Sequence, residues 1–158
     1  MSESRLQTAI SGSFKFKPEI DELIDQCADM GVDVLEPTKG WLWTPGMDVA
    51  PSSFRPLPAE RGIGIAQVEN RFLRAITKAD FLYVYTQGQY VGASTCLEVG
   101  FALGIEKPIY TSEPIAHVLA EGDLEHLIYL ENRLVVAGIA EAVRMERSRQ
   151  PDPKGRTF

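Results

Sequence analysis

Residues 81–102 have the sequence FLYVYTQGQYVGASTCLEVGFA. The first five are apolar or aromatic, which is typical of a buried strand, and a loop containing small residues follows them. Gly92 then precedes a helical pattern that carries one carboxylate, Glu98. Open α/β sheets build sites for phosphates and sugars from a strand, a glycine-bearing loop and a helix, because the N–H groups at the helix start point into the crevice. This segment therefore predicts a site near Glu98.

The rest of the chain continues the alternation of strands and helices. Strands are predicted at residues 6–14, 32–37, 81–86, 108–111 and 134–137, and helices at 18–31, 65–78, after Gly92, at 115–129 with a break near Gly122, and at 139–149. Such alternation predicts an α/β fold with a doubly wound five-stranded parallel sheet, and five strands suit the flavodoxin-like order 2-1-3-4-5. In that order the loop Ser11-Gly12-Ser13-Phe14 lies beside the segment from Gln87 to Glu98.

Length and composition fit a single domain over residues 1–150, followed by a loose polar tail at 151–158. The chain has 158 residues, of which 44% are hydrophobic and 24% charged, as is ordinary for a globular protein. The strand and helix rhythm is interrupted by a long loop at residues 38–62, which contains four prolines, Trp41 and Trp43. We expect an ordered flap there, in which the tryptophans stack on a nucleobase or pack against a core or a second subunit.

Charge and hydropathy exclude several classes of function. The net charge of −6 argues against binding to a nucleic acid polymer, for which a basic face is needed. No apolar stretch approaches the ~20 residues of a membrane span, and the first residues lack the apolar core of a signal peptide. Cys27 and Cys96 show no metal-ligand spacing, nor do the two histidines. A cytoplasmic protein with reduced thiols, without a metal site and without a membrane partner, is expected.

Three stretches resemble the nucleoside 2-deoxyribosyltransferase superfamily, which includes the 2'-deoxynucleoside 5'-monophosphate N-glycosidases. The first is a strand that runs into a glycine–serine turn, at residues 10–14. The second is Lys78-Ala79-Asp80 followed by an apolar strand. The third is similar to the family element Gly-Thr-x-x-Glu-x-Gly-x-Ala, and here reads STCLEVGFA at residues 94–102. Together the three stretches span about residues 8 to 112.

The resemblance implies the chemistry of an N-glycosyl enzyme and roles for individual residues. Glu98 matches the family glutamate that attacks the anomeric carbon, displaces the base and forms a glycosyl ester, which water or a second base then resolves. The resemblance also implies a small-molecule nucleoside or nucleotide as substrate, no metal or organic cofactor, and a homodimer or larger assembly. The candidate substrate-binding residues are Ser11, Gly12, Ser13, Phe14, Gly92, Ser94, Thr95, Asp80, Tyr90 and Trp43.

The sequence also departs from the family pattern. Family transferases carry one aspartate a few residues before the nucleophile and another on the preceding helix. Those positions fall here on Gly92 and near Phe72, and Glu69 or Asn70, about one turn away, are possible substitutes. A non-catalytic nucleotide-binding or sensing module on the same fold is therefore the alternative function.

Three other interpretations compete with an N-glycosyl enzyme. Thr95-x-x-Glu98 also fits a capping box, in which Glu98 would bond back to the Thr95 N–H. A cytokinin-activating type of phosphoribohydrolase is disfavoured, because its Pro-Gly-Gly-x-Gly-Thr signature is absent from the sequence. A flavodoxin-type electron carrier is disfavoured too, since Ser11-Gly12-Ser13-Phe14-Lys15 is a poor phosphate loop for a flavin.

Overall fold

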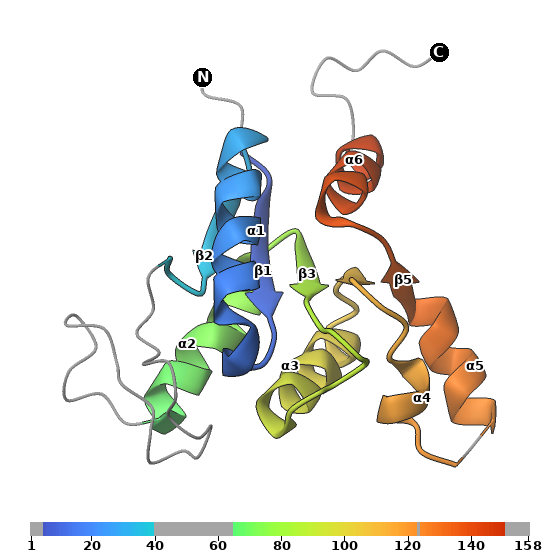
Figure 1. The fold of residues 1–158 in the computed structure, drawn as a ribbon. Helices are drawn as coiled ribbons and strands as arrows, with labels where there is room; N and C mark the ends of the chain where they lie inside the picture. The colour runs from blue at the N-terminus through green and yellow to red at the C-terminus, as the bar shows by residue number, and fades with distance from the viewer. Residues whose placement is uncertain (1–4, 40–64, 123, 151–158) are drawn as a thin grey trace, which may run out of the picture.

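The structure is a computed structural model, and it describes residues 5–39, 65–122 and 124–150 (Figure 1). Trp43, the loop predicted at 38–62 from residue 40 onward, and the tail predicted at 151–158 lie outside the described residues. The elements are β1 (Gln7–Ser11), η1 (Phe14–Phe16), α1 (Lys17–Asp29), β2 (Asp33–Glu36), α2 (Ile65–Lys78), β3 (Phe81–Val84), α3 (Ala93–Gly104), β4 (Ile109–Thr111), α4 (Ala116–Leu119), α5 (Leu124–Arg133), β5 (Leu134–Val136) and α6 (Ile139–Arg149).

The five strands form one parallel sheet in the order β2-β1-β3-β4-β5, which confirms the strand order predicted from the sequence. Between β1 and β3 the register pairs Ile10 with Tyr83 and Ser11 with Val84. The last residue of β1 therefore lies beside the last residue of β3. Because the connections from these two strands leave toward opposite faces of the sheet, the carboxyl ends of β1 and β3 form the switch point at which such folds bind ligands.

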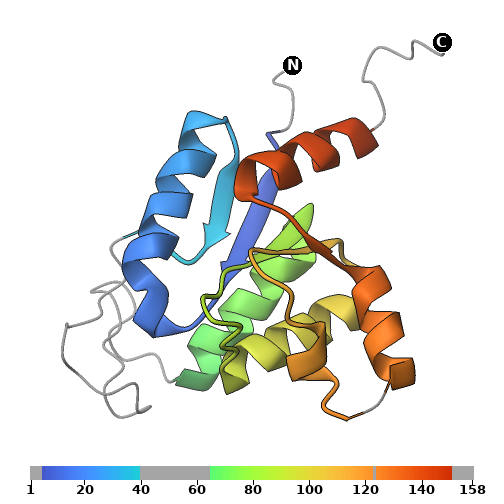
Figure 2. The same cartoon turned by 45° about the vertical axis from the view of Figure 1, so that its right-hand side comes forward.

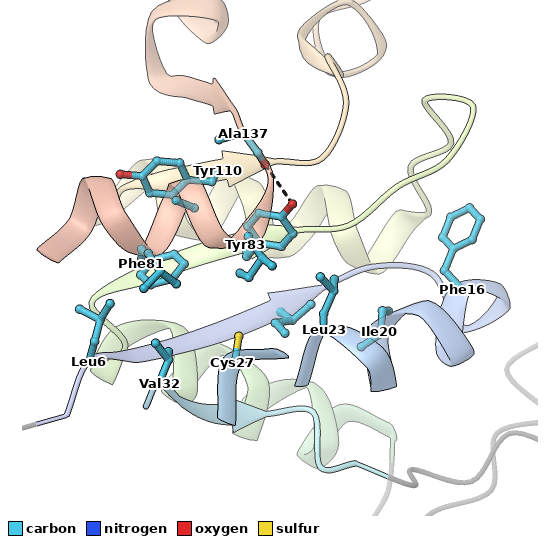
Figure 3. Close-up of a cluster of buried hydrophobic side chains, with 14 residues drawn as sticks. Leu6, Phe16, Ile20, Leu23, Cys27, Val32, Phe81, Tyr83, Tyr110 and Ala137 are labelled. Carbon is cyan, nitrogen blue, oxygen red and sulfur yellow. Dashed lines mark hydrogen bonds between the residues drawn. The ribbon is translucent and has the colours of Figure 1, made fainter. Parts of the chain in front are cut away.

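The sheet is covered by helices on both faces, and each face has its own apolar core. On one face α1 and α6 pack on Ile10 and Tyr83, and the Tyr83 hydroxyl donates a hydrogen bond to the Ala137 carbonyl at 3.0 Å (Figure 3). On the other face α2, α3 and α5 pack on Ala9 and Leu82 (Figure 2). Consecutive strand residues point to opposite faces, so strands buried on both sides need the continuous apolar runs seen in this sequence.

The structure differs from the sequence prediction at the end of the first strand and confirms the predicted break in the helix near Gly122. The first strand ends at Ser11 rather than at residue 14, and η1 follows it. A side chain at Gly12 would place its Cβ only 2.9 Å from the carbonyl oxygen of Tyr85, the residue after β3, so any residue larger than glycine would have to displace its neighbour. The helix predicted at 115–129 is divided into α4 and α5, and Gly122, with φ +86°, lies in the predicted break. Across the described ranges, none of the helices is long and apolar enough to span a membrane.

Candidate active site

Glu98 is the central residue of the site, and it is buried within the second turn of α3. Only 5% of its surface is exposed. Gly92 is the N-cap of α3 and the helix begins at Ala93, so Thr95 is already inside the first turn. The capping-box interpretation is therefore wrong, because it required Thr95 to be the N-cap. The burial of a glutamate side chain needs another explanation, since ionisable side chains are almost never fully buried without a partner.

The first partner of Glu98 is Ser11, the last residue of β1. Its hydroxyl donates a short hydrogen bond to Glu98 Oε2, and both side chains are buried. This bond joins the carboxyl end of β1 to α3 across 87 positions of sequence. The sequence placed Ser11 and Glu98 on two walls of one pocket, and the structure brings them into direct contact.

The second partner of Glu98 is another carboxyl group, that of Glu69 on α2. The two carboxyl groups are close enough to perturb each other's pKa, and a proton shared between them would link them by a hydrogen bond. Glu69 is half-buried, and its Oε1 atom is buried without a hydrogen-bond partner among the described residues. Asn70, the other possible substitute for the family aspartate, is exposed. The structure thus brings Glu69 to Glu98 and leaves Asn70 outside the pair.

Burial raises the pKa of both carboxyl groups, and the like charge of Glu69 raises that of Glu98 further. Burial raises the pKa of Glu98 well above its ordinary 4.5, the charge of Glu69 raises it further, and the hydrogen bond from Ser11 opposes the shift. Burial also raises the pKa of Glu69, while its hydrogen bond with Glu98 lowers it. Two carboxylates in contact cannot both ionise cheaply, so the pair favours a single shared proton. Without a ligand that proton resides mainly on Glu98, the more buried group.

The start of α3 supplies polar groups beside the pair. Ser94 and Thr95 precede Glu98 by four and three residues, which places all three on one side of the helix. Ser94 is exposed and Thr95 is buried. Gly92 has an extended backbone and no side chain, so the first N–H groups of α3 lack a side-chain acceptor from the N-cap. These are the groups that a sugar hydroxyl or a phosphate oxygen can use.

A small hollow of about 10 Å³, room for roughly one water molecule, adjoins the loop after β1. Gly12, Ser13 and Phe14 line it together with Lys17, Ile20, Asp21 and Pro37. Ser13 is the N-cap of η1 and makes no side-chain cap bond, whereas Lys17 forms an ion pair with Asp21 at 2.7 Å. Three of the predicted binding residues thus border this small hollow, directly after Ser11 in the sequence.

Tyr90 closes the loop between β3 and α3. The exposed Tyr90 ring lies under the Lys15 ammonium, whose Nζ is 3.1 Å from the ring centroid, and it makes an edge contact with Phe16. The loop turns through Gly88 and Gln89, both with φ near +60°, and their N–H groups donate to the Glu113 carboxylate. Lys15 was not singled out from the sequence, because only the packing of η1 against this loop brings it there.

Asp80 lies away from the site, contrary to the prediction. Its carboxylate accepts a hydrogen bond from the Gln7 N–H at 2.8 Å, and its own N–H donates to the Gln7 carbonyl at 2.8 Å. Gln7 begins β1 and Asp80 directly precedes β3. Asp80 therefore links the amino ends of β1 and β3 through hydrogen bonds, whereas Glu98 lies near the carboxyl ends of these strands. Trp43, outside the described residues, has no assigned place.

Comparison with known proteins supports the fold and leaves the family open. No protein-family model and no curated protein matches the sequence. Among solved structures, the chain is similar to the crystal structure of a conserved protein from Enterococcus faecalis V583, with a TM-score of 0.55 and 12% sequence identity. The match covers 93% of this chain and 100% of that chain. At this identity the likeness concerns the fold alone.

Proposed function

We propose that the protein is an N-glycosyl enzyme, either a 2-deoxyribosyltransferase or an N-glycosidase, that acts on nucleosides or nucleotides. The observation that carries the proposal is the buried Glu98–Glu69 carboxyl pair, held by Ser11 at the carboxyl edge of the sheet. Neither glutamate forms an ion pair with another described residue. A buried, uncompensated carboxyl pair costs stability, and such costs concentrate at functional sites. The resemblance of residues 94–102 to the family element supports the same reaction.

The pair holds what an N-glycosidic cleavage requires, namely one carboxylate and one acidic proton. The proton on Glu98 first passes to Glu69 along the hydrogen bond between them, which leaves Glu98 ionised. The Glu98 carboxylate then attacks the anomeric carbon, the bond from that carbon to the base nitrogen breaks, and the departing nitrogen takes the Glu69 proton. The electron pair of the broken bond stays with the base. Water or a second base later resolves the glycosyl ester, and the proton it releases returns to Glu69.

The proton shuttle also explains why burial favours this chemistry. A carboxylate freed of its proton inside a dry site is poorly solvated and is therefore more reactive toward a carbon that develops positive charge. The Ser11 hydroxyl keeps one oxygen of Glu98 in place. Ser94, Thr95 and the first N–H groups of α3 lie where they can bind sugar hydroxyls or a 5'-phosphate.

The direct test is base release from deoxynucleosides and deoxynucleoside monophosphates, with and without a second free base, followed by chromatography. Glu98→Gln is expected to abolish turnover. The control is Glu146→Gln, because Glu146 is also 5% exposed yet its carboxylate accepts hydrogen bonds from Tyr110 on β4 and Arg149 on α6. Acid quenching during turnover, followed by peptide mass analysis, is expected to find a deoxyribosyl adduct on Glu98. Absence of base release across the whole panel would contradict an enzymatic role.

The alternative of a non-catalytic nucleotide-binding module is favoured by one observation. Near the position of the family aspartate on the helix before β3, this chain has Phe72, which is buried in the core of the α2/α3 face. A binding module predicts that nucleotides raise the melting temperature without being consumed. It also predicts that Glu98→Gln retains that thermal shift, in which case the carboxyl pair would be a relic of the chemistry.

A further inference from the structure

A second cavity lies at the edge of the sheet that is opposite to Glu98. Its volume is about 170 Å³, and it is bordered by residues 106–108, by β4 and β5, and by the last turns of α5 and α6. Residues 106–108 lead into the amino end of β4, whereas Glu98 lies near the carboxyl ends of β1 and β3. A cavity of this size holds a ligand of about six to eight non-hydrogen atoms. The cavity is therefore large enough for a small ligand and is separate from the Glu98 site.

Three cationic side chains line this cavity, and each comes from a different segment. Lys107 directly precedes Pro108 and β4, Arg133 is the last residue of α5, and Arg149 is the last residue of α6. Among the described residues that line the cavity, Glu106 is the only acidic one. The chain as a whole has a net charge of −6, so a cavity with an excess of positive charge is not expected from composition. This excess indicates an anionic ligand.

Two of the three cations are held in place by neutral groups. Lys107 Nζ donates to the carbonyls of Thr77 at 3.2 Å and Ala79 at 2.5 Å. Arg133 donates to the Tyr129 hydroxyl at 2.9 Å. Neither Lys107 nor Arg133 forms an ion pair with another residue in the described ranges. An ammonium group has three N–H donors and a guanidinium group five, so both side chains keep donors for a ligand.

The third cation, Arg149, is positioned by a buried carboxylate. Glu146 Oε1 accepts hydrogen bonds from the Tyr110 hydroxyl at 2.6 Å and from Arg149 at 3.2 Å. Glu146 is only 5% exposed, so Tyr110 fixes its carboxylate, which in turn holds the guanidinium at the border of the cavity. Arginines are favourable at the carboxyl ends of helices, where the helix dipole is negative. That preference does not explain why two helix ends and Lys107 border the same cavity.

We propose that this cavity binds a small anion with a phosphate group, either inorganic phosphate or a compact phosphate monoester. A carboxylate has two oxygens in one plane, which a single guanidinium can bind. Two guanidinium groups and an ammonium group from three segments suit the several oxygens of a tetrahedral phosphate better. The proposal does not depend on the chemistry of Glu98, because the two sites lie at opposite edges of the sheet.

Titration calorimetry of the full-length protein with inorganic phosphate, methyl phosphate and acetate, at constant ionic strength, tests this proposal. Both phosphates are expected to bind more tightly than acetate, and the tighter of the two shows whether the site prefers a free phosphate or a monoester. Arg133→Gln is expected to weaken phosphate binding by about tenfold or more, because a hydrogen bond to a charged group is lost. Arg74→Gln is the matched control, since Arg74 is exposed on α2 and does not line the cavity. Equal affinities in the two variants would overturn the proposal.

Amide signals in nuclear magnetic resonance spectra separate this cavity from the start of α3, where a phosphate of the proposed substrate would bind. Inorganic phosphate is expected to shift the amide signals of residues 106–107 and 132–135 in the wild type, and to shift them less at the same concentration in Arg133→Gln. Shifts confined to residues 92–95 would assign the phosphate to the Glu98 site and refute a second one.

Discussion

Glu98→Gln is expected to stabilise the fold while it abolishes the proposed chemistry. Glutamine has nearly the same volume, its amide oxygen can accept the hydrogen bond from Ser11, and its amide N–H can donate to Glu69. What the substitution removes is the ability to ionise. In the wild type that ability is costly, because burial and the neighbouring charge of Glu69 raise the pKa of Glu98 well above its ordinary 4.5.

The size of the gain follows from proton linkage. A carboxyl group whose pKa is raised by folding binds its proton more tightly in the folded protein, so the stability of the wild type falls as pH rises above 4.5 and continues to fall up to the raised pKa. Each pH unit in this window costs about 1.36 kcal/mol, which sets a ceiling of about 3.4 kcal/mol for Glu98 at pH 7. We expect Glu98→Gln to gain about 1–3 kcal/mol at pH 7 and almost nothing at pH 4.5.

Urea unfolding of both proteins between pH 4.5 and pH 7 measures this difference, and each 1 kcal/mol corresponds to a rise in melting temperature of about 2–4 °C for a chain of this size. Glu146→Gln is the control, because Glu146 is buried to the same extent but accepts hydrogen bonds from Tyr110 and Arg149. The Glu146 substitution removes an ion pair with Arg149 and is expected to lower stability. A Glu98→Gln protein that is less stable at pH 7, or equally stabilised at both pH values, would refute this account of the pair.

Three other substitutions test separate parts of the structure. Gly12→Ala is expected to cost about 1–3 kcal/mol of unfolding free energy, because its Cβ would lie 2.9 Å from the Tyr85 carbonyl oxygen; Gly138→Ala, which meets open space, serves as the control in the same urea titration. Asp80→Asn is expected to lower stability by about 1 kcal/mol, through the weakened bond from the Gln7 N–H, and to leave base release per folded molecule unchanged. Glu69→Gln is expected to slow release of an unactivated base by about 10²–10⁴-fold and to spare a deoxyribosyl substrate whose leaving group needs no proton; equal losses with both substrates would argue against Glu69 as the acid.

The arrangement of strands was predictable because it is encoded in short apolar runs. Strands covered on both faces must be apolar at consecutive positions, and the alternation of such runs with helical patterns leaves few possible topologies. The boundary at Ser11 was not predictable, because it depends on the close approach of Gly12 to Tyr85, which involves residues 73 positions apart. The prediction for Asp80 was wrong for a related reason. The residues beside it in the sequence resemble a family motif, whereas its carboxylate accepts a hydrogen bond from Gln7 at the start of β1.

The sequence predicted two of the three residues that meet at the carboxyl pair and left the third, Glu69, as one of two alternatives. Glu98 could be identified from its motif, and Ser11 from the strand order. Glu69 was one of two possible substitutes on its helix, and the sequence did contain a signal that favoured it. Glu69 falls three residues before the buried Phe72 and seven before the buried Ile76, on the apolar stripe of α2, where a carboxylate is out of place. Asn70 falls on the exposed side. The contact between Glu69 and Glu98 depends on how α2 packs on α3, which the sequence does not show.

The hydroxyl of Ser11 belongs to a residue that is hydrogen-bonded into the middle of the sheet, with β2 on one side of its strand and β3 on the other. A hydrogen-bond donor anchored in this way has little freedom to move when a ligand arrives, so the entropy cost of ordering it is met when the chain folds. New substrate specificities would then arise through changes in the surrounding loops. A shift in the register of β1 against β3 would displace Ser11 from Glu98, and the proposed activity would fall before the amount of folded protein did.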